Sequence, residues 1–324
     1  METLNQTESK SIIKNFFKTA WREYSVVIIF IIVFVLCSII APKFASINNL
    51  RAILRNISTI GMISLGMTFV LISGGIDLSS GSVLATTGTV LILLQGSGRV
   101  PLWVAIAACI VVGVAFGFIN GIIITKTNLP PFIVTLAVGI IARSVTMFVT
   151  KAATITGRNV PEFTNIGNGN FLGIPIPFWI VLFFIVVFTI LLTKTKFGTY
   201  VFAVGGNELA ARYSGIKVDR IKILTYMLLG FCVAVGATIE MSRMAAVAST
   251  TSGNLYEFEA ITAAVVGGTS ISGGRGKIIG TVVGFLILGI ISNMMIMMNI
   301  SPYLNGAVKG AVILFAVLLQ RRER

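Results

Sequence analysis

The sequence predicts an all-α integral membrane protein with about ten transmembrane helices, some of them broken or re-entrant. Of its 324 residues, 56% are hydrophobic and only 11% are charged, whereas about 25% charged residues are usual in soluble domains. The charges are also segregated, so that long runs such as Tyr24–Pro42 and Val100–Thr125 contain none. Because about 20 apolar residues cross a bilayer as a helix, several of these runs are long enough to span it.

The apolar runs place ten expected spans, with boundaries uncertain by several residues. They lie at 24–41, 52–72, 80–95, 101–125, 131–150, 175–193, 222–243, 258–272, 278–298 and 303–319. An even number puts both termini on one side, and we expect that side to be the cytoplasm because Lys and Arg gather on cytoplasmic loops. In this topology the basic residues of outer segments are few, namely Lys43, Arg51, Arg55, Arg99, Lys151 and Arg158.

We expect one membrane domain over residues 1–324, because no linker or low-complexity stretch divides it. Segments 1–23 and 320–324 are expected in the cytoplasm, as is a long basic loop at 194–222, and Lys151–Pro175 is expected to be a long outer loop. The basic N-terminus followed by an apolar run resembles a signal peptide, but the run is too long and no A-x-A site follows. It is therefore predicted to be an uncleaved first span.

Composition also excludes several kinds of function. The chain has no His, so His-based catalysis and His-ligated metal sites are excluded. Cys37, Cys109 and Cys232 stand apart in apolar runs, which favours core packing over metal binding. The net charge of +14 fits cytoplasmic loops, and no aromatic and basic interleaving indicates nucleic acid. We expect no catalytic residues, no metal and no cofactor.

The first segment of interest interrupts the apolar runs at Gly74-Gly75-Ile76-Asp77-Leu78-Ser79. Adjacent glycines weaken a helix by roughly 1 kcal/mol each. If Asp77 lies within the membrane, the cost of at least ~2.5 kcal/mol requires a cavity or a partner. An ordinary turn in which Asp77 caps the next helix is an equally good interpretation.

A second segment, Ile261–Gly280, contains Gly267, Gly268, Thr269, Gly273 and Gly274. It is not a phosphate-binding loop, because Ile278 follows Gly276-Lys277 where Ser or Thr is required. Its weak similarity to the first segment has two explanations. One is chance between Gly-rich sequences, and the other is a duplicated transporter core, in which broken helices at matching positions mark the permeation site.

The basic loop contains a predicted short helix. Asn207 is a good N-cap, Glu208 suits the positive end of a helix, and Gly215 is a good residue just beyond its end. A helix of about two turns is marginal in water by itself. It therefore packs either on its own membrane domain or on a cytosolic partner.

With these motifs the chain resembles the membrane permease subunits of bacterial ATP-binding-cassette sugar importers, the ribose type most closely. The resemblance covers most of the chain in the family's order. It rests on Gly74–Ser79 with Gly81-Ser82, Pro131–Leu136, Gly205-Gly206-Asn207 with Ala210-Ala211 and Ser214-Gly215-Ile216, and Ala260–Ser270 with Gly273-Gly274, Gly276 and Gly280-Thr281. It departs at Ser80, where Val is frequent, and at Gly74, where Ser is common.

The resemblance implies a permease of the bacterial cytoplasmic (inner) membrane that works as a homodimer or a paired permease. A cytosolic ATPase would hydrolyse ATP, and an extracytoplasmic binding protein would deliver the solute. Residues near the translocation path or its gates would be Gly74, Gly75, Asp77, Ser79, Gly267, Gly268, Thr269, Gly273 and Gly274. Residues that couple to the ATPase would be Gly205, Gly206, Asn207, Glu208, Ala210, Ala211, Ser214 and Gly215.

Other functions remain open on the sequence alone. Ribose is the first expected solute, and another pentose or hexose, a sugar-derived signal or a nucleoside follow in that order. An ion-coupled secondary transporter would be expected to need buried ionisable residues along its path. The candidates are few (Asp77, Arg143, Glu240, Arg243 and Lys309). We expect Arg143 and Lys309 to snorkel or to pair with another residue, and Glu240 and Arg243 to form a local ion pair. A membrane enzyme has no supporting motif.

Overall fold

The computed structural model describes residues 26–127, 129–158 and 160–301, together with 304, 306–308, 310–311 and 314. The expected segments 1–23 and 320–324 and residue Lys309 lie outside the described part. Of the expected span at 303–319, the described residues 304, 306–308, 310, 311 and 314 are helical.

The described chain is mostly helical, with a first helix at Val26–Ile40. The further helices are α2 (Ile47–Ile72), α3 (Ser80–Ser97), α4 (Leu102–Thr127), α5 (Pro131–Thr150), α6 (Pro161–Asn168), α7 (Ile176–Lys194), α8 (Lys196–Gly206), α9 (Glu208–Tyr213), α10 (Val218–Met244), α11 (Tyr256–Val266) and α12 (Ile278–Met297). The strands are β1 (Thr154–Thr156), β2 (Asn170–Phe171), β3 (Ile174–Pro175) and β4 (Ala246–Ala248).

Within the described residues, six helices are long and apolar enough to cross a membrane, namely α2, α4, α5, α7, α10 and α12. Helix α3 and the helix Val26–Ile40 coincide with two further expected spans. The expected span at 258–272 is wrong in its extent, because α11 ends at Val266. Gly267 and Gly268 end this helix, and Gly268 has a φ of +88° that side chains with a Cβ rarely adopt.

The expectation of an all-α protein needs a small correction. Two antiparallel pairs, β1 with β4 and β2 with β3, lie in the expected outer loop and after α10. The pairing of Ile155 with Val247 ties this loop to the end of α10. The loop at 194–222 also contains α8, a helix that the sequence did not predict.

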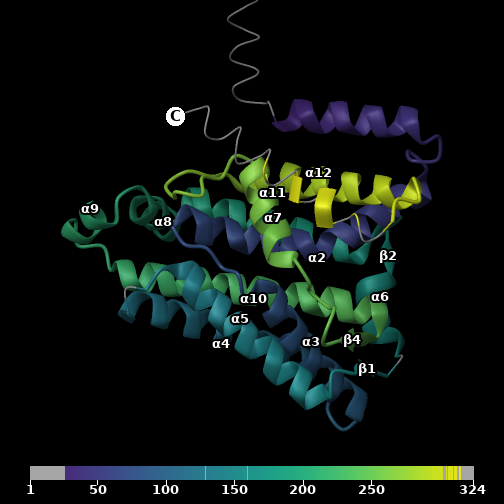
Figure 1. The fold of residues 1–324 in the computed structure, drawn as a ribbon, viewed down its shortest axis with the longest axis horizontal. Coiled ribbons are helices and arrows are strands. Elements are labelled where there is room, and N and C mark those ends of the chain that lie inside the picture. Colours follow the sequence, from purple (N-terminus) through teal and green to yellow (C-terminus); the bar gives the residue numbers. More distant parts are fainter. Residues whose placement is uncertain are drawn as a thin grey trace, which may run out of the picture.

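The helices form two layers (Figure 1). One layer contains α2, α7, α11 and α12, and the other contains α3, α4, α5 and α10, while α8 and α9 extend from one end and α6 and the strands lie at the other. Helices α2 and α10 are central, with 78% and 67% of their most apolar stretches buried, whereas only 22% is buried in α4 and 28% in α7. The outer helices thus present apolar surface, as lipid-facing helices do.

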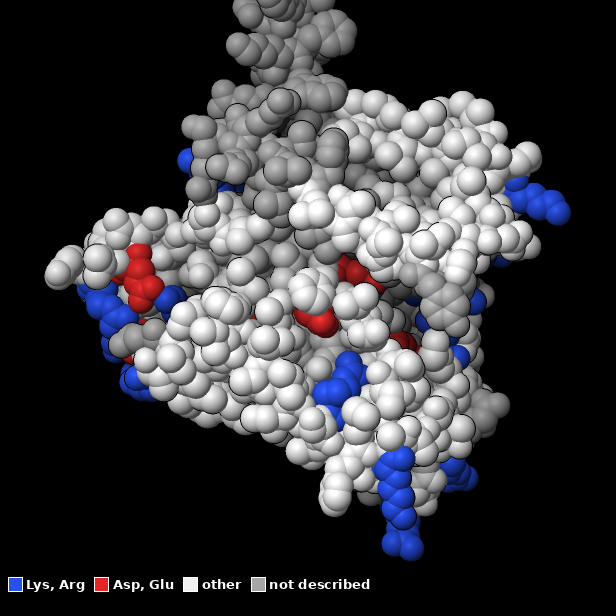
Figure 2. Space-filling view, in the orientation of Figure 1, with Lys and Arg blue, Asp and Glu red and all other residues white. Residues whose placement is uncertain are grey.

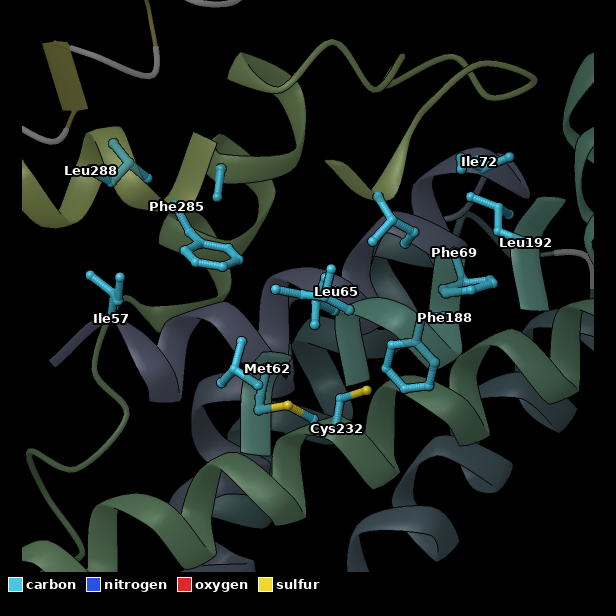
Figure 3. Close-up of a cluster of buried hydrophobic side chains, with 14 of the residues drawn as sticks. Ile57, Met62, Leu65, Phe69, Ile72, Phe188, Leu192, Cys232, Phe285 and Leu288 are labelled. Atoms are coloured by element: carbon cyan, nitrogen blue, oxygen red, sulfur yellow. The ribbon is translucent and has the colours of Figure 1, made fainter. Parts of the chain in front are cut away.

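The core between the layers is apolar and closely packed. Figure 3 shows one of its two clusters, in which Phe69 and Phe188 pack edge to face at a centroid distance of 5.7 Å. Cys37, Cys109 and Cys232 are all free and buried, as expected for core residues.

A row of glycines sets the distance between α4 and α10. A Cβ on Gly113 would lie 2.9 Å from the Cβ of Ala234, one on Gly117 would lie 2.7 Å from the carbonyl carbon of Tyr226, and one on Gly121 would lie 2.7 Å from the Cα of Ile223. These spacings are shorter than real Cβ contacts. The i, i+4, i+8 spacing is the small-residue motif that lets membrane helices approach closely.

Candidate functional site

The two glycine-rich segments meet at one end of the molecule, and the end of α8 lies against both. We call Gly74, Gly205, Gly273 and Gly274 the glycine junction. A Cβ on Gly205 would overlap the carbonyl oxygen of Ile72 and would lie 2.7 Å from the nitrogen of Gly274. The backbone N–H of Gly274 donates to that same carbonyl at 2.9 Å.

The remaining contacts of the glycine junction also require glycine. A Cβ on Gly273 would lie 2.7 Å from the oxygen of Gly205 and 3.0 Å from the Cα of Gly74. Gly74 and Gly273 have φ values of +80° and +84°, which side chains with a Cβ tolerate poorly. Three backbones separated in sequence therefore touch directly.

A surface cleft of about 330 Å³ opens beside the glycine junction. It is lined by Gly205, Gly206, Ser270, Ser272, Gly273, Gly274 and Arg275. Here the end of α8 and the turn before α12 share one surface.

Next to the glycine junction, α11 and α12 pack backbone to backbone. A Cβ on Gly280 would lie 3.0 Å from the carbonyl carbon of Gly267, and one on Gly284 would lie 2.8 Å from that of Ala263. The hydroxyls of Thr68 and Thr281 hydrogen-bond at 2.7 Å and tie α2 to α12. The helices are closed against one another along this stretch.

Asp77 is 3% exposed and orders the turn before α3. Its Oδ1 accepts hydrogen bonds from the backbone N–H of Ser79 at 2.7 Å and from the hydroxyls of Ser79 and Ser80. Asn120 of α4 donates to Asp77 Oδ2 at 3.1 Å and to the Ser79 hydroxyl at 2.9 Å. The helix-cap interpretation is wrong, because Ser79 is the N-cap of α3 and no side chain makes a cap hydrogen bond there. Asp77 is instead a buried carboxylate that orders the turn and has a polar partner on α4.

Two other helices hold the same turn. Thr135 of α5 accepts from the N–H of Leu78 at 3.0 Å, and the hydroxyl of Tyr226 of α10 donates to the oxygen of Ile76 at 3.1 Å. The turn at 76–79 is therefore fixed by side chains from α4, α5 and α10.

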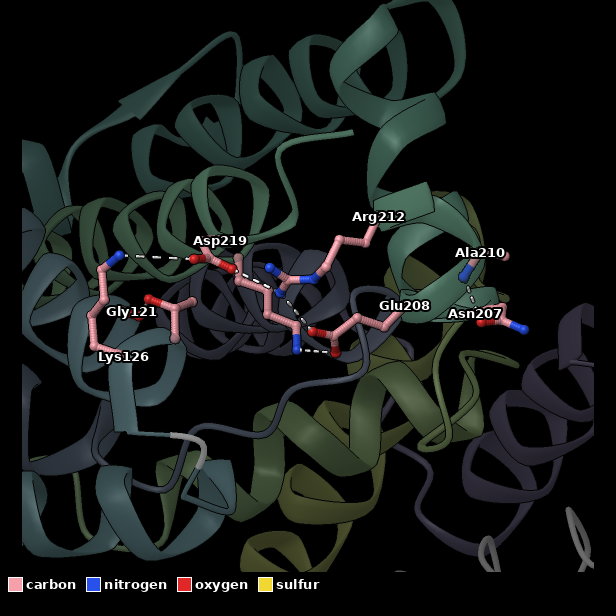
Figure 4. A network of polar contacts seen from close by, with 9 residues as sticks. Gly121, Lys126, Asn207, Glu208, Ala210, Arg212 and Asp219 are labelled. Carbon is pink, nitrogen blue, oxygen red and sulfur yellow. Dashed lines mark hydrogen bonds and ion pairs between the residues drawn. The ribbon is translucent and has the colours of Figure 1, made fainter. Parts of the chain in front are cut away.

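Helix α9 has the predicted caps. The side chain of Asn207 accepts from the N–H of Ala210 at 2.9 Å, and Gly215 has a φ of +80°. Three ion pairs involve the helix, namely Lys222–Glu208 at 2.5 Å, Arg212–Glu208 at 3.4 Å and Arg212–Asp219 at 2.9 Å (Figure 4). A fourth pair, Lys126–Asp219 at 3.9 Å, connects this network to α4.

The two sides of α9 differ in exposure. Ala211 is 4% exposed and packs inward, whereas Leu209 and Tyr213 are 67% and 90% exposed. An apolar side chain and an aromatic ring thus face outward from a helix that ion pairs hold in place.

Desolvation alone would raise the pKa of Glu208, but the hydrogen bond and charge of Lys222 and of Arg212 outweigh it and hold the pKa below its usual value. The carboxylate is therefore ionised at neutral pH and keeps its partners.

Comparisons with known proteins agree with this geometry. The family model of the branched-chain amino acid transport system / permease component matches residues 49–317. The chain belongs to this permease family. It is 39% identical over 315 residues to the ribose import permease protein RbsC of Escherichia coli strain K12, covering 96% of this chain and 98% of that protein. It is 42% identical to RbsC of Bacillus subtilis strain 168, covering 91% of each chain.

The L-arabinose transport system permease protein AraH of Escherichia coli strain K12 is 38% identical, covering 95% of this chain and 93% of that protein. The search of solved structures found no match. The chain is thus a multi-pass membrane permease component of a transport system and not an enzyme.

The permease brings together some of the predicted residues and separates others. Gly74, Gly205, Gly273 and Gly274 converge, and Gly267 lies nearby against Gly280. Gly75 instead packs against the Tyr226 hydroxyl, while Thr269 is buried beside Gly276. Gly206 and Gly268 have no neighbour within 4 Å of a built Cβ, and Ser214 caps the end of α9.

The structure gives the partners of three ionisable residues of the permease. Arg143 donates to the carbonyls of Ser249, Ser252 and Gly81, at 2.9, 2.7 and 3.3 Å, and the opposite charge of Glu257 acts on it. The expected Glu240–Arg243 ion pair is wrong. Arg243 donates to Asn56 Oδ1, and Glu240 bonds to the Tyr256 side chain.

Sequence reasoning missed Asn120, Thr135 as a contact of the Asp77 turn, and the row Gly113, Gly117, Gly121. The four-residue glycine spacing was a readable signal for close helix packing. Asn120 within an apolar run was another, because a buried amide requires partners.

Proposed function

We propose that this permease is the membrane-spanning subunit of an ATP-driven importer, that it translocates a monosaccharide, and that ribose is its first candidate solute. The ribose permeases and the arabinose permease above are 38 to 42% identical to the chain. Identity to permeases of two different sugars supports the solute class more strongly than the individual sugar.

The observation that carries the proposal is the connection from α9 to the glycine junction. Exposed Leu209 and Tyr213 lie on α9, ion pairs fix α9 to α10, and α8 leads back to Gly205 against the end of α2. A cytosolic ATPase that binds α9 would act on the helix ends through this contact. We propose that α9 and its caps form the coupling element, in which Ala211 contributes by packing inward. The residues of this element are Asn207, Glu208, Ala210, Ala211, Ser214 and Gly215.

The same placement supports a proposal for the topology. We propose about ten spans, with both termini, α8, α9 and the glycine junction on the cytoplasmic side of the inner membrane. Lys194, Lys196, Lys217, Arg220, Lys222, Arg275 and Lys277 lie in the segments at that end. The permease would act as a homodimer or a pair, with an extracytoplasmic binding protein that supplies affinity. Gly75, Asp77, Ser79, Gly267, Gly268 and Thr269 would belong to the gate region.

The experiment is uptake by proteoliposomes that contain the permease, its ATPase and its binding protein. We expect uptake of a radiolabelled pentose that requires ATP hydrolysis and both partners. Unlabelled ribose, arabinose and allose as competitors would identify the sugar. Uptake by the permease alone, driven by an ion gradient and indifferent to ATP, would refute the proposal in favour of a secondary transporter.

A further inference from the structure

A second, polar cavity lies far along α2 from the glycine junction. It has a volume of about 290 Å³ and is enclosed by the first half of α2, the second half of α12, the end of α10 and the start of α11. We call it the polar cavity. It is lined by Ile53, Asn56, Ile57, Ile60, Arg243, Tyr256, Glu259, Phe285, Leu288, Gly289, Ser292, Asn293 and Ile296.

The polar cavity is closed toward the glycine junction. Phe285, which is 1% exposed, packs against Gly61 at the floor, where a Cβ on Gly61 would lie 3.3 Å from the ring. Beyond the floor, α11 and α12 touch at Ala263 and Gly284. The polar cavity is therefore a blind recess that ends where the helices pack.

Some hydrogen-bonding groups of this recess have no partner among the described residues. Arg243 donates to the side-chain oxygen of Asn56. This contact leaves the NH₂ group of the same amide available as a donor. Within the described residues, this NH₂ group and the hydroxyl of Ser292 have no hydrogen-bond partner. The side chain of Asn293, in contrast, exchanges two hydrogen bonds with that of Asn49, at 2.9 and 3.0 Å, and so contributes only to the wall of the polar cavity.

This composition suits a neutral polyhydroxylated ligand. Each sugar hydroxyl both donates and accepts, so its site needs donors such as Asn56 and Arg243 alongside acceptors such as Glu259 and Ser292. The aliphatic walls at Ile53, Ile57, Ile60 and Leu288 suit the C–H faces of a sugar ring. Ligand sites of this kind are mostly apolar with a few placed polar groups.

The acidic side chains on the face seen in Figure 2 gather in two places, in a hollow at its centre and near the end where α8 and α9 lie. Most of the remaining surface of this face carries no charge, and the basic side chains lie largely toward its edges. Ionisable side chains at membrane depth are costly, so by default they indicate a functional site.

From these features we infer that the polar cavity is a subsite for one monosaccharide on its way through the permease, contacted by Asn56, Arg243, Tyr256, Glu259 and Ser292. This rests on the proposed function and adds the position at which the sugar is held before the closed helices part. The subsite lies toward the end of the permease opposite to the glycine junction. This is the end at which a binding protein would deliver the sugar.

The test uses Ser292→Cys in the full permease, reconstituted with its ATPase and binding protein. The native cysteines are buried, so a small neutral thiol reagent reports on the introduced one. We expect labelling to reduce ATP-driven uptake at least about tenfold and saturating ribose to slow the labelling several-fold. Ser97→Cys is the matched control, because Ser97 is exposed at the end of α3 and does not line the polar cavity; its labelling should change neither quantity.

The outcomes separate the two proposals. If wild-type liposomes import sugar with ATP but labelled Ser292→Cys imports normally and sugar gives no protection, the subsite is refuted and the importer stands. If wild-type liposomes show no ATP-dependent sugar uptake, the importer itself fails. If leucine protects and ribose does not, the polar cavity binds an amino acid and the sugar assignment is overturned.

Discussion

Replacing Gly205 by Ala perturbs the glycine junction at its tightest point. The added Cβ would lie 2.8 Å from the carbonyl carbon of Ile72 and would overlap its oxygen, whereas ordinary contact begins at 3.4 Å. The end of α8 must therefore move away from α2 by more than half an ångström. This movement stretches the hydrogen bond from Gly274 to Ile72.

The adjacent Gly206 is a matched control, because a Cβ at this position meets nothing within 4 Å. Both residues lie at the end of α8, so each substitution gains up to about 1 kcal/mol of helix propensity, which largely cancels in the comparison. Overpacking costs roughly 1–3 kcal/mol. We expect Gly205→Ala to be less stable than Gly206→Ala by that amount.

The assay is the apparent melting temperature of the purified permease in detergent or nanodiscs. Since 1 kcal/mol corresponds to roughly 2–4 °C in a domain of 150–250 residues, the two variants should differ by several degrees. In proteoliposomes Gly205→Ala should also lose uptake relative to ATP hydrolysis. Equal melting temperatures and equal uptake would show that the close approach at Gly205 carries neither stability nor coupling.

Three further predictions concern α4 and α9. Gly117→Ala should lower stability by roughly 1–3 kcal/mol, seen in thermal melting, because its Cβ would lie 2.7 Å from the carbonyl carbon of Tyr226; an unchanged melting point would contradict the packing argument. Tyr213→Ala should reduce co-purification with the ATPase without altering melting, because this ring is 90% exposed; unchanged co-purification would remove it from the interface. The pKa of Glu208 is depressed, so its contribution to α9 is complete above about pH 4.5 and is lost as pH falls through the lower folded value. Hydrogen exchange of the α9 amides, corrected for intrinsic rates, should then rise, and Glu208→Gln should abolish this pH dependence; an identical pH response in both proteins would refute the role of the Lys222 pair.

Local signals in the sequence predicted local structure well. The capping residues Asn207 and Gly215 predicted α9 because caps act within a few residues of the helix end. Long apolar runs predicted the six long apolar helices for a similar reason, since each run is long enough by itself to cross a bilayer.

Contacts between distant segments could not be read in this way. That Gly74, Gly205 and Gly273 touch depends on how α2 and α8 end beside the loop that precedes α12, which no single stretch encodes. The end of α11 at Val266 was missed because the segment that follows, up to Ser272, carries no charge and was included in the span, although Gly267 and Gly268 had already ended the helix. Arg143 illustrates the same limit, because the carbonyls that it binds belong to residues more than sixty positions away in sequence.

Helix α2 touches both ends of the permease that the proposals use. Its last residue, Ile72, receives the hydrogen bond of Gly274 at the glycine junction, while Asn56 faces the polar cavity. The sixteen residue steps from Asn56 to Ile72 span roughly 24 Å at 1.5 Å per step. A hydrogen-bonded helix hardly compresses along its axis, so an axial displacement of Ile72 carries Asn56 with it. Movement at the end of α8 would thus alter the geometry of the polar cavity without a series of side-chain rearrangements between them. The distance between Asn56 and Ser292 would then change with the position of α9.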